Sequence, residues 1–200
     1  MKKIAVFASG RGSNFSAIMS AIKRGTLSCG CALLVCDTPG APVLAKAKRA
    51  GVPVFLLDRE SCTSREEFER RIAAKLKEEK VELIVLAGFM RIIGATLIHA
   101  FRNRIINIHP ALLPAFKGAH GIQDAFDYGV KITGITVHFV DERTDHGPII
   151  LQSCLAVKEN ENVDKLEARI HRLEHRLYPK AIRLFLEGKL KVAGRKVRVG

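Results

Sequence analysis

The sequence predicts an α/β fold with three layers, in which a mostly parallel, twisted sheet carries helices on both faces. Over the first hundred residues, short apolar runs suited to buried strands alternate with helical stretches, as in parallel strands joined by right-handed crossovers. A glycine-rich turn, Ser9–Asn14, connects the first of these strands to the first helix. Beyond residue 131, two strand-like runs flank a short polar connection, which predicts an antiparallel C-terminal extension of the sheet.

The first half is expected to be Rossmann-like, because strands and helices alternate regularly along it. Periodicity places strands at 4–8, 32–36, 52–56, 83–87 and 105–108, and helices at 15–23, 41–50, 64–80 and up to about 101. Ser64 stands three residues before Glu67, a capping-box pattern that marks the start of the helix at 64–80.

The second half is expected to hold longer elements. Strands are predicted at 132–140 and 149–157, a long helix at 163–186 and a basic hairpin at 190–199. Pro179 is expected to kink the long helix and Gly188 to end it. The apolar stripe of this helix comprises Leu166, Ile170, Leu173, Leu177, Ala181 and Leu184. The segment 115–131, with a short helix near 123–127, is either a connector or a mobile lid.

Length and composition indicate one globular domain over residues 1–200, with a phosphate-binding half up to about 110 and an active-site half beyond it. Hydrophobic residues make up 48% and charged residues 26%, which is ordinary globular composition. No apolar run approaches the roughly 20 residues of a membrane span, and the apolar stretch after Lys3 is too short for a signal peptide. Five cysteines, an odd number, fit reduced thiols in the cytoplasm better than a disulfide framework.

The net charge of +13 favours anionic partners. Phosphorylated metabolites, a polyanionic cofactor tail and nucleic acid all satisfy that condition. A nucleic-acid-binding module also needs a clustered basic face with aromatic side chains, and the chain has two tyrosines and no tryptophan. Charge by itself selects none of these partners. Because the aromatic side chains are few, we predict no nucleic-acid partner, and we predict no membrane partner.

The turn at Ser9–Asn14 has the composition of an anion site, since free backbone N–H groups and a helix dipole meet there. Phe15 occupies the place of the third glycine of a dinucleotide fingerprint, although Asp37 could mimic the ribose-binding acid of that fingerprint. No Walker lysine follows Gly12. A terminal phosphate is the better expectation; a plain connecting turn is the alternative.

Asn107 lies in the predicted strand at 105–108, and His109 directly follows that strand. Being two residues apart, their side chains point the same way. An imidazole can act as acid or base near neutral pH, and an amide can hold a developing oxyanion. The alternative is an asparagine that caps the next turn and a histidine satisfied by backbone. Gly10–Asn14, Gly88–Arg91 and Asn107–Pro110 all follow strands, where parallel sheets bind ligands, and this favours the functional interpretation.

The connection from Asp141 to Pro148 is tight and acidic. It could bring a carboxylate beside His109, which would raise the pKa of the imidazole and fix its tautomer. A solvated turn is the alternative. A second histidine pattern, His171-x-x-Glu174-His175, matches one class of zinc peptidase but lacks a third protein ligand. We predict no metal site.

Four segments occur in an order and spacing that closely resemble the phosphoribosylglycinamide formyltransferases, the folate-dependent transformylases of purine synthesis. They are Ser9-Gly10-x-Gly12-Ser13-Asn14, Leu86-Ala87-Gly88-Phe89-Met90-Arg91, Asn107-Ile108-His109-Pro110-Ala111-Leu112-Leu113-Pro114 and Asp145-x-Gly147-Pro148-Ile149-Ile150. The likeness spans nearly the whole chain.

The resemblance implies an enzyme that takes the formyl group from 10-formyltetrahydrofolate as co-substrate, without a metal, and gives it to the amine of glycinamide ribonucleotide. The amine would attack the formyl carbon directly while Asn107 and protonated His109 stabilise the oxyanion and Asp145 orients and charges His109. The residues implied for the ribonucleotide are Gly12, Ser13, Asn14, His171 and Glu174. Those implied for the folate are Arg65, Met90, Arg91, Ile92, Ile93, Asn107, Asp141 and Glu142. The enzyme would be a monomer or homodimer in the cytoplasm.

The chain departs from the resembling enzymes at His146, where a small residue is usual. This imidazole could compete for the hydrogen bond of Asp145. The loop after Pro114 also differs, which leaves the role of His120 open. Formyltetrahydrofolate hydrolases and methionyl-tRNA formyltransferases share the Asn-His-Asp set, but they carry an additional N-terminal or C-terminal domain for which these 200 residues leave no room.

Overall fold

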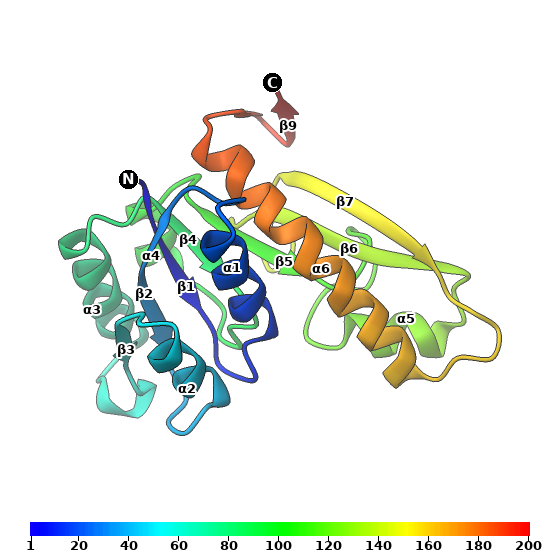
Figure 1. Cartoon of the computed structure of the whole chain (residues 1–200), viewed down its shortest axis with the longest axis horizontal. Coiled ribbons are helices and arrows are strands. Elements are labelled where there is room, and N and C mark those ends of the chain that lie inside the picture. Colours follow the sequence, from blue (N-terminus) through cyan, green and yellow to red (C-terminus); the bar gives the residue numbers. More distant parts are fainter. The chain divides into compact units, whose positions relative to one another are not determined.

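The computed structural model describes residues 1–200, with the side chain of Arg59 left aside, and it contains two compact units (Figure 1). The first unit is Met1–Ile106 and the second is Asn107–Gly200. The boundary falls inside strand β5, Ile105–His109. The expectation of one domain over 1–200, with halves meeting near residue 110, stays a prediction.

The first unit is built on parallel strands in the order β3-β2-β1-β4. Every strand pair in this part of the described chain is parallel, as the alternation of strands and helices predicts. Strands β1 and β4 are buried almost throughout, which explains their uninterrupted apolar sequences. The strands are β1 (Lys3–Phe7), β2 (Gly30–Cys36), β3 (Val54–Leu56) and β4 (Leu83–Leu86).

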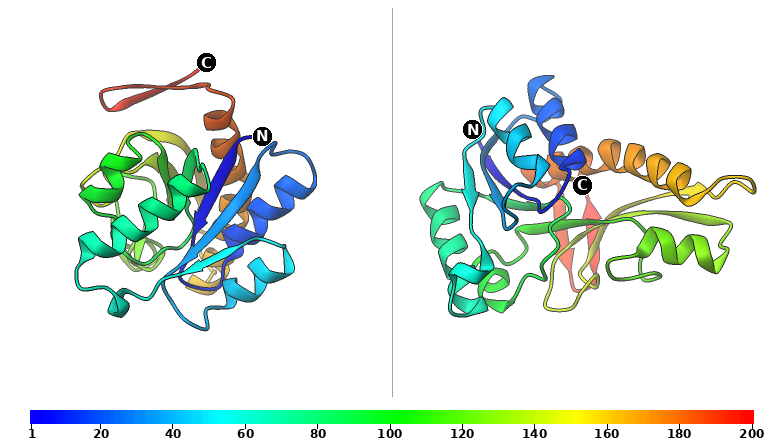
Figure 2. Two further views of the ribbon diagram at one scale, coloured as in Figure 1. Left: turned by 90° about the vertical axis from the view of Figure 1, so that its left-hand side faces the viewer. Right: turned by 90° about the horizontal axis from the view of Figure 1, so that it is seen from below.

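Helices cover both faces of these strands. Figure 2 shows α1 and α2 on one side and α3 on the other. The helix at Arg65–Glu78 begins as predicted, because the Ser64 hydroxyl accepts a hydrogen bond from the Glu67 N–H at 3.0 Å. The helices of this unit are α1 (Ser13–Lys23), α2 (Pro42–Arg49), the 3-10 turn η1 (Arg59–Ser61), α3 (Arg65–Glu78) and α4 (Ala95–Ala100).

The second unit is built mainly on antiparallel strand pairs. Strands β6 (Ile132–Phe139) and β7 (Ile149–Ala156) form a long antiparallel pair, and β8 (Leu190–Ala193) and β9 (Lys196–Val199) form the predicted hairpin. Strand β9 joins β7 where Lys196 pairs with Ile149. The predicted class, a mostly parallel sheet with helices on both faces and an antiparallel C-terminal extension, is confirmed.

Helix α6 (Val163–Leu186) packs on β6 and β7, and its start is capped by the Asn162 side chain. It runs through Pro179 to Leu186. The predicted apolar stripe was wrong at Leu173 and Leu177, which are half-buried; Glu174, Tyr178 and Ile182 are buried in their place. A spacing of four residues continues from Leu166 and Ile170 along this face. Helix α5 (Gly121–Tyr128) is longer than the predicted 123–127.

No helix in the described part of the chain combines the length and the apolar character that crossing a membrane requires.

Candidate active site

Strand β5 presents Asn107 and His109 on one side, as its period of two predicts. The side chain of His109 is buried, at 3% exposure, and that of Asn107 is half-buried. Both residues belong to the second unit. An amide and an imidazole therefore lie together in a largely water-excluded place.

The turn between β6 and β7 brings Asp145 to this pair. Its Oδ2 lies 3.4 Å from His109 Nδ1, and its Oδ1 lies 3.5 Å from the Asn107 amide nitrogen. The Asp145 side chain is 9% exposed. The structure thus brings together all three residues of the expected catalytic set.

His138, on β6, completes the cluster and has no counterpart among the predicted site residues. Its Nδ1 donates to the Phe139 carbonyl at 2.7 Å. Its Nε2 lies 3.3 Å from the Asn107 amide nitrogen and 3.6 Å from Asp145 Oδ1. A neutral ring accepts from the amide, and a charged ring donates to the carboxylate. The available signal was a histidine within the predicted strand at 132–140, since a buried polar side chain needs a partner.

The segment after Pro114 also reaches the cluster. The Phe116 carbonyl lies 2.7 Å from His109 Nε2, and the Gly118 N–H donates to Asp145 Oδ2 at 2.9 Å. A carbonyl only accepts, so Nε2 carries a proton in this arrangement. The nitrogen of His109 that faces away from Asp145 is therefore a hydrogen-bond donor.

Burial and charge act against each other at this site. Burial lowers the pKa of His109 below its ordinary value, and the Asp145 charge and the Phe116 carbonyl offset this only in part. For Asp145, burial would raise the pKa, but the His138 ring, the hydrogen bond from the Gly118 N–H and the nearby His109 imidazole leave it below its ordinary value. Asp145 is thus an anion at neutral pH, held against two imidazoles.

The glycine turn of the first unit ends at the N-terminus of α1. Gly12 has φ +69°, and a Cβ there would lie 2.5 Å from Val43 Cγ2, so a glycine is required. The N-cap of this helix makes no side-chain hydrogen bond, and the backbone N–H groups of a helix start are a common binding place for anions. Lys46, which sequence patterns did not single out, places its ammonium 3.4 Å from the Gly12 carbonyl. Ser13 and Asn14 form the first turn of α1, and Asn14 is buried.

Arg65, one of the residues predicted for the folate in the first unit, is held by a buried carboxylate that sequence analysis missed. Glu69, on α3, is 4% exposed. Its Oε1 accepts from the Gly94 N–H at 2.5 Å and from Arg65 Nε at 3.2 Å, and its Oε2 accepts from the Leu97 N–H at 3.2 Å. Arg65 also donates to the Ile92 carbonyl at 2.7 Å. Glu69 therefore joins the start of α4, the preceding loop and Arg65.

The same loop is tied to the glycine turn. The Ser9 hydroxyl accepts from the Met90 N–H at 2.9 Å, and Arg91 Nε donates to the buried Asp37 carboxylate at 2.6 Å. Asp37 is thus paired with Arg91, which argues against its ribose-binding role. Met90 and Ile92 are exposed, at 72% and 64%, whereas the Ile93 side chain is buried. Two of the three segments predicted to meet beyond the strands therefore lie together.

The remaining predicted folate residues, Asp141 and Glu142, lie in the turn that carries Asp145. His146 Nδ1 donates to Asp141 Oδ2 at 2.8 Å. His146 is therefore engaged with Asp141, and the competition for Asp145 that its position suggested is not observed.

His171 and Glu174 lie on α6, where their side chains contact each other. His171 Nδ1 is 2.9 Å from Glu174 Oε2, and Nε2 is 3.1 Å from Glu167 Oε1. The hydrogen bond to Glu174 raises the pKa of His171, burial opposes the rise, and the Glu167 contact adds to it. His175 stacks on His171. Among the described residues, no group of three His, Cys, Asp or Glu side chains has the arrangement of a metal site.

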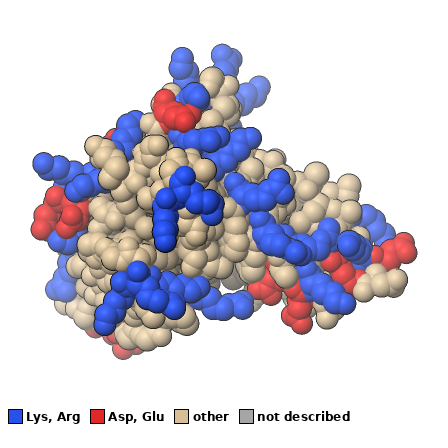
Figure 3. Space-filling view, in the orientation of Figure 1, with Lys and Arg blue, Asp and Glu red and all other residues tan. Residues whose placement is uncertain are grey.

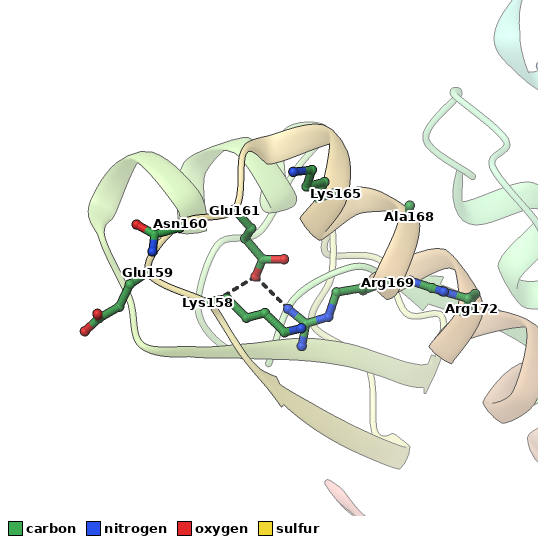
Figure 4. Close-up of a pocket in the computed structure, with 8 residues that line it drawn as sticks. All are labelled: Lys158, Glu159, Asn160, Glu161, Lys165, Ala168, Arg169 and Arg172. Carbon is green, nitrogen blue, oxygen red and sulfur yellow. Dashed lines mark hydrogen bonds and ion pairs between the residues drawn. The ribbon is translucent and has the colours of Figure 1, made fainter.

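A cavity of about 640 Å³ lies between the start of α6 and the segment that precedes it (Figure 4). Glu161 accepts there from the Lys158 N–H at 2.7 Å and from Arg169 at 2.6 Å. None of the residues predicted for either substrate lines this cavity. Its lining residues are Lys158, Glu159, Asn160, Glu161, Lys165, Ala168, Arg169 and Arg172.

Known proteins are similar to this chain in both sequence and fold. The formyl transferase family model matches residues 2–182. The phosphoribosylglycinamide formyltransferase of Bacillus subtilis is 48% identical over 93% of this chain and 95% of its own length. The trifunctional purine biosynthetic protein adenosine-3 of Gallus gallus is 41% identical over 95% of this chain, which spans 19% of that longer protein.

Among solved structures, glycinamide ribonucleotide transformylase 1 from Symbiobacterium toebii matches with a TM-score of 0.97 and 44% identity. The match covers 100% of this chain and 94% of that one. The matched length, the identity and the shared fold show that the chain belongs to the formyl transferase family, the family of the phosphoribosylglycinamide formyltransferases.

Proposed function

We propose that the chain transfers the formyl group of 10-formyltetrahydrofolate to the amine of glycinamide ribonucleotide, a step of purine biosynthesis. The observation that carries the proposal is the cluster of Asn107, His109 and Asp145, with the carboxylate 3.4 Å from the imidazole. The similarity to phosphoribosylglycinamide formyltransferases supports the choice of substrates.

The chemistry needs no covalent bond to the protein. The acceptor amine attacks the formyl carbon, and negative charge develops on the formyl oxygen. The Asn107 amide and the N–H of His109 donate to that oxygen, which they stabilise best in a buried site. Asp145 orients the ring and favours its charged form as the oxyanion appears. A bound water relays the proton from the amine to the departing folate nitrogen.

The N–H at Nε2 of His109 supports the role of this residue as a hydrogen-bond donor to the formyl oxygen. Its Nε2 already faces a carbonyl oxygen, that of Phe116, at 2.7 Å. A formyl oxygen has the same acceptor chemistry and would replace Phe116 at this nitrogen. The segment 115–131 must then shift when the donor binds, which is how its predicted lid function would operate.

Each substrate is assigned its own set of residues. Gly12, Ser13 and Asn14 hold the ribonucleotide phosphate at the start of α1, where N–H groups and the Lys46 ammonium favour an anion. Glu174 and His171 contact the acceptor end. The folate lies against Arg65, the loop from Met90 to Ile93, Asn107, and the turn with Asp141 and Glu142.

Both substrates are anionic small molecules, and we propose no nucleic-acid partner and no metal. The cysteines are free thiols, which is consistent with a reducing compartment, and we expect the enzyme in the cytoplasm as a monomer or homodimer.

The test is formyl transfer from 10-formyltetrahydrofolate, followed by tetrahydrofolate release, with and without glycinamide ribonucleotide. Release that requires the acceptor supports the proposal. Release at the same rate without acceptor would identify a hydrolase instead. Transfer to methionyl-tRNA, with no transfer to the ribonucleotide, would also overturn it.

A further inference from the structure

The C-terminal hairpin reaches the turn that carries Asp145. Arg195 follows the hairpin tip at Gly194, and its Nη2 donates to the His146 carbonyl at 2.7 Å. Its Nη1 lies 3.1 Å from each ring nitrogen of His146. Strand β9 brings the arginine there by pairing Lys196 with Ile149. The family match ends at residue 182, before this hairpin begins.

The turn itself has little regular structure. Asp145 has φ +47°, a left-handed conformation that non-glycine residues adopt at a cost. Inside the turn, Asp141 accepts from the Arg143 N–H at 3.0 Å and from His146 at 2.8 Å. A Cβ on Gly147 would overlap the Phe139 carbonyl, so the turn packs closely on the end of β6. A strained residue such as Asp145 keeps its conformation only while its neighbours are held.

We propose that Arg195 is a positioning residue for catalysis: by holding the His146 carbonyl and ring, it keeps the Asp145 carboxylate beside His109. The inference rests on the proposed function, in which Asp145 orients and charges His109. Arg195 acts through His146 and does not touch the reacting atoms.

The distances between Asp145 and the two imidazoles make the site sensitive to the support that Arg195 gives to the turn. The separations of Asp145 from His109 and His138, 3.4 and 3.6 Å, are already long for hydrogen bonds. A small movement of the turn would therefore remove them. The planar guanidinium meets both a carbonyl and a ring with one fork, which a lysine ammonium cannot reproduce.

The imidazole of His109 reports this positioning directly. Charged or polar groups face it from each element packed against it: Asp145 from the turn, His138 from β6, Glu174 from α6 and the Phe116 carbonyl. Loss of Arg195 releases only the turn. The pKa of His109 should then fall, because the Asp145 charge that raises it moves away.

The experiment compares Arg195→Ala and Arg195→Lys with Arg198→Ala, which removes the same charge from an exposed position on β9. We expect Arg195→Ala to lower kcat about fivefold, with KM for both substrates within about twofold, because one hydrogen-bonded support of Asp145 is lost. The alkaline limb of the kcat profile should move to lower pH. The kcat of Arg195→Lys should lie between those of Arg195→Ala and the parent chain, and the kcat of Arg198→Ala should match that of the parent chain.

Titration of His109 by NMR, in the parent chain and the variants, separates this inference from the proposed function. A parent chain without formyl transfer refutes the function, yet a lowered His109 pKa in Arg195→Ala still supports the positioning. An unchanged kcat profile and an unchanged His109 titration in Arg195→Ala would overturn the inference. If Arg195→Ala unfolds at a markedly lower temperature than the parent chain, the pH profile of kcat and the His109 titration of Arg195→Lys test the inference instead.

Discussion

At His109, both ring nitrogens face acceptors, the Asp145 carboxylate and the Phe116 carbonyl. This arrangement favours the charged ring, whereas burial disfavours it, and burial prevails in lowering the pKa. This balance suits an imidazole whose protonated form becomes favoured only when an oxyanion forms beside it.

Changes at this residue should therefore be costly. We expect His109→Ala and Asp145→Asn each to lower kcat by about a hundredfold or more, because a hydrogen-bond donor to the oxyanion and its charge partner are lost. The measurement is single-turnover formyl transfer with both substrates saturating. His99→Ala, which changes an exposed histidine on α4, is the control. Near-normal rates in either active-site variant would contradict the assigned roles.

His171 provides a second prediction, concerning stability. Glu174 and Glu167 raise its pKa in the folded chain. Its charged form therefore stabilises the fold below about pH 6.5, the ordinary value, and that contribution disappears as pH rises through the raised folded value.

The check is the melting temperature of the parent chain and of His171→Gln across mildly acidic to mildly alkaline pH. The parent should be the more stable at acidic pH, and the difference should narrow as pH rises. A difference that stays constant across the range would refute the linkage.

At the scale of elements, Glu69 shows how one buried side chain joins a helix to a loop. Its carboxylate satisfies two N–H groups at the start of α4 and holds Arg65, which in turn reaches the Ile92 carbonyl. These are the N–H groups that a helix start leaves without intrahelical partners. The rigidity of the loop proposed to contact the folate therefore depends on the Glu69 carboxylate.

Glu69→Ala should destabilise the fold by about 2 to 4 kcal/mol, because two buried donors lose their acceptor. It should also raise KM for 10-formyltetrahydrofolate more than KM for the ribonucleotide. Urea unfolding and steady-state kinetics measure the two effects. Glu78→Ala, which removes an exposed carboxylate from the same helix, should change neither. Equal effects of the two variants would argue against the role of Glu69.

At the scale of the whole molecule, the excess of basic residues is visible as a surface property. On the face seen in Figure 3, Lys and Arg side chains far outnumber Asp and Glu, in keeping with the net charge of +13. A field of this sign attracts anions over several ångströms and is screened by salt.

The corresponding prediction concerns the rate of substrate capture. Raising the salt concentration should lower kcat/KM for the anionic ribonucleotide by about tenfold or less, while kcat changes little, because salt screens the attraction but not the buried cluster. Steady-state kinetics across a potassium chloride series, with sucrose as a neutral control, measures this. A salt-independent kcat/KM would show that the basic surface plays no part in capture.

Much of the architecture was readable from local patterns. Apolar runs and helical spacing located the parallel strands, the hairpin and α6, and the period of two placed Asn107 beside His109. The start of α3 was readable from Ser64 and Glu67. Within α6 the pattern failed at Tyr178 and Ile182, because which face is buried depends on what packs against it.

The sequence by itself determined the kinds and order of the elements and the pairing of an amide with an imidazole on one strand, since these depend on neighbours a few residues apart. Only the tertiary structure decided that His138 joins Asn107, His109 and Asp145, that Glu69 supports a loop 25 residues away and that Arg195 reaches His146 across 49 residues. Such contacts depend on how strands and turns are directed in space. Local periodicity carries no information about those directions.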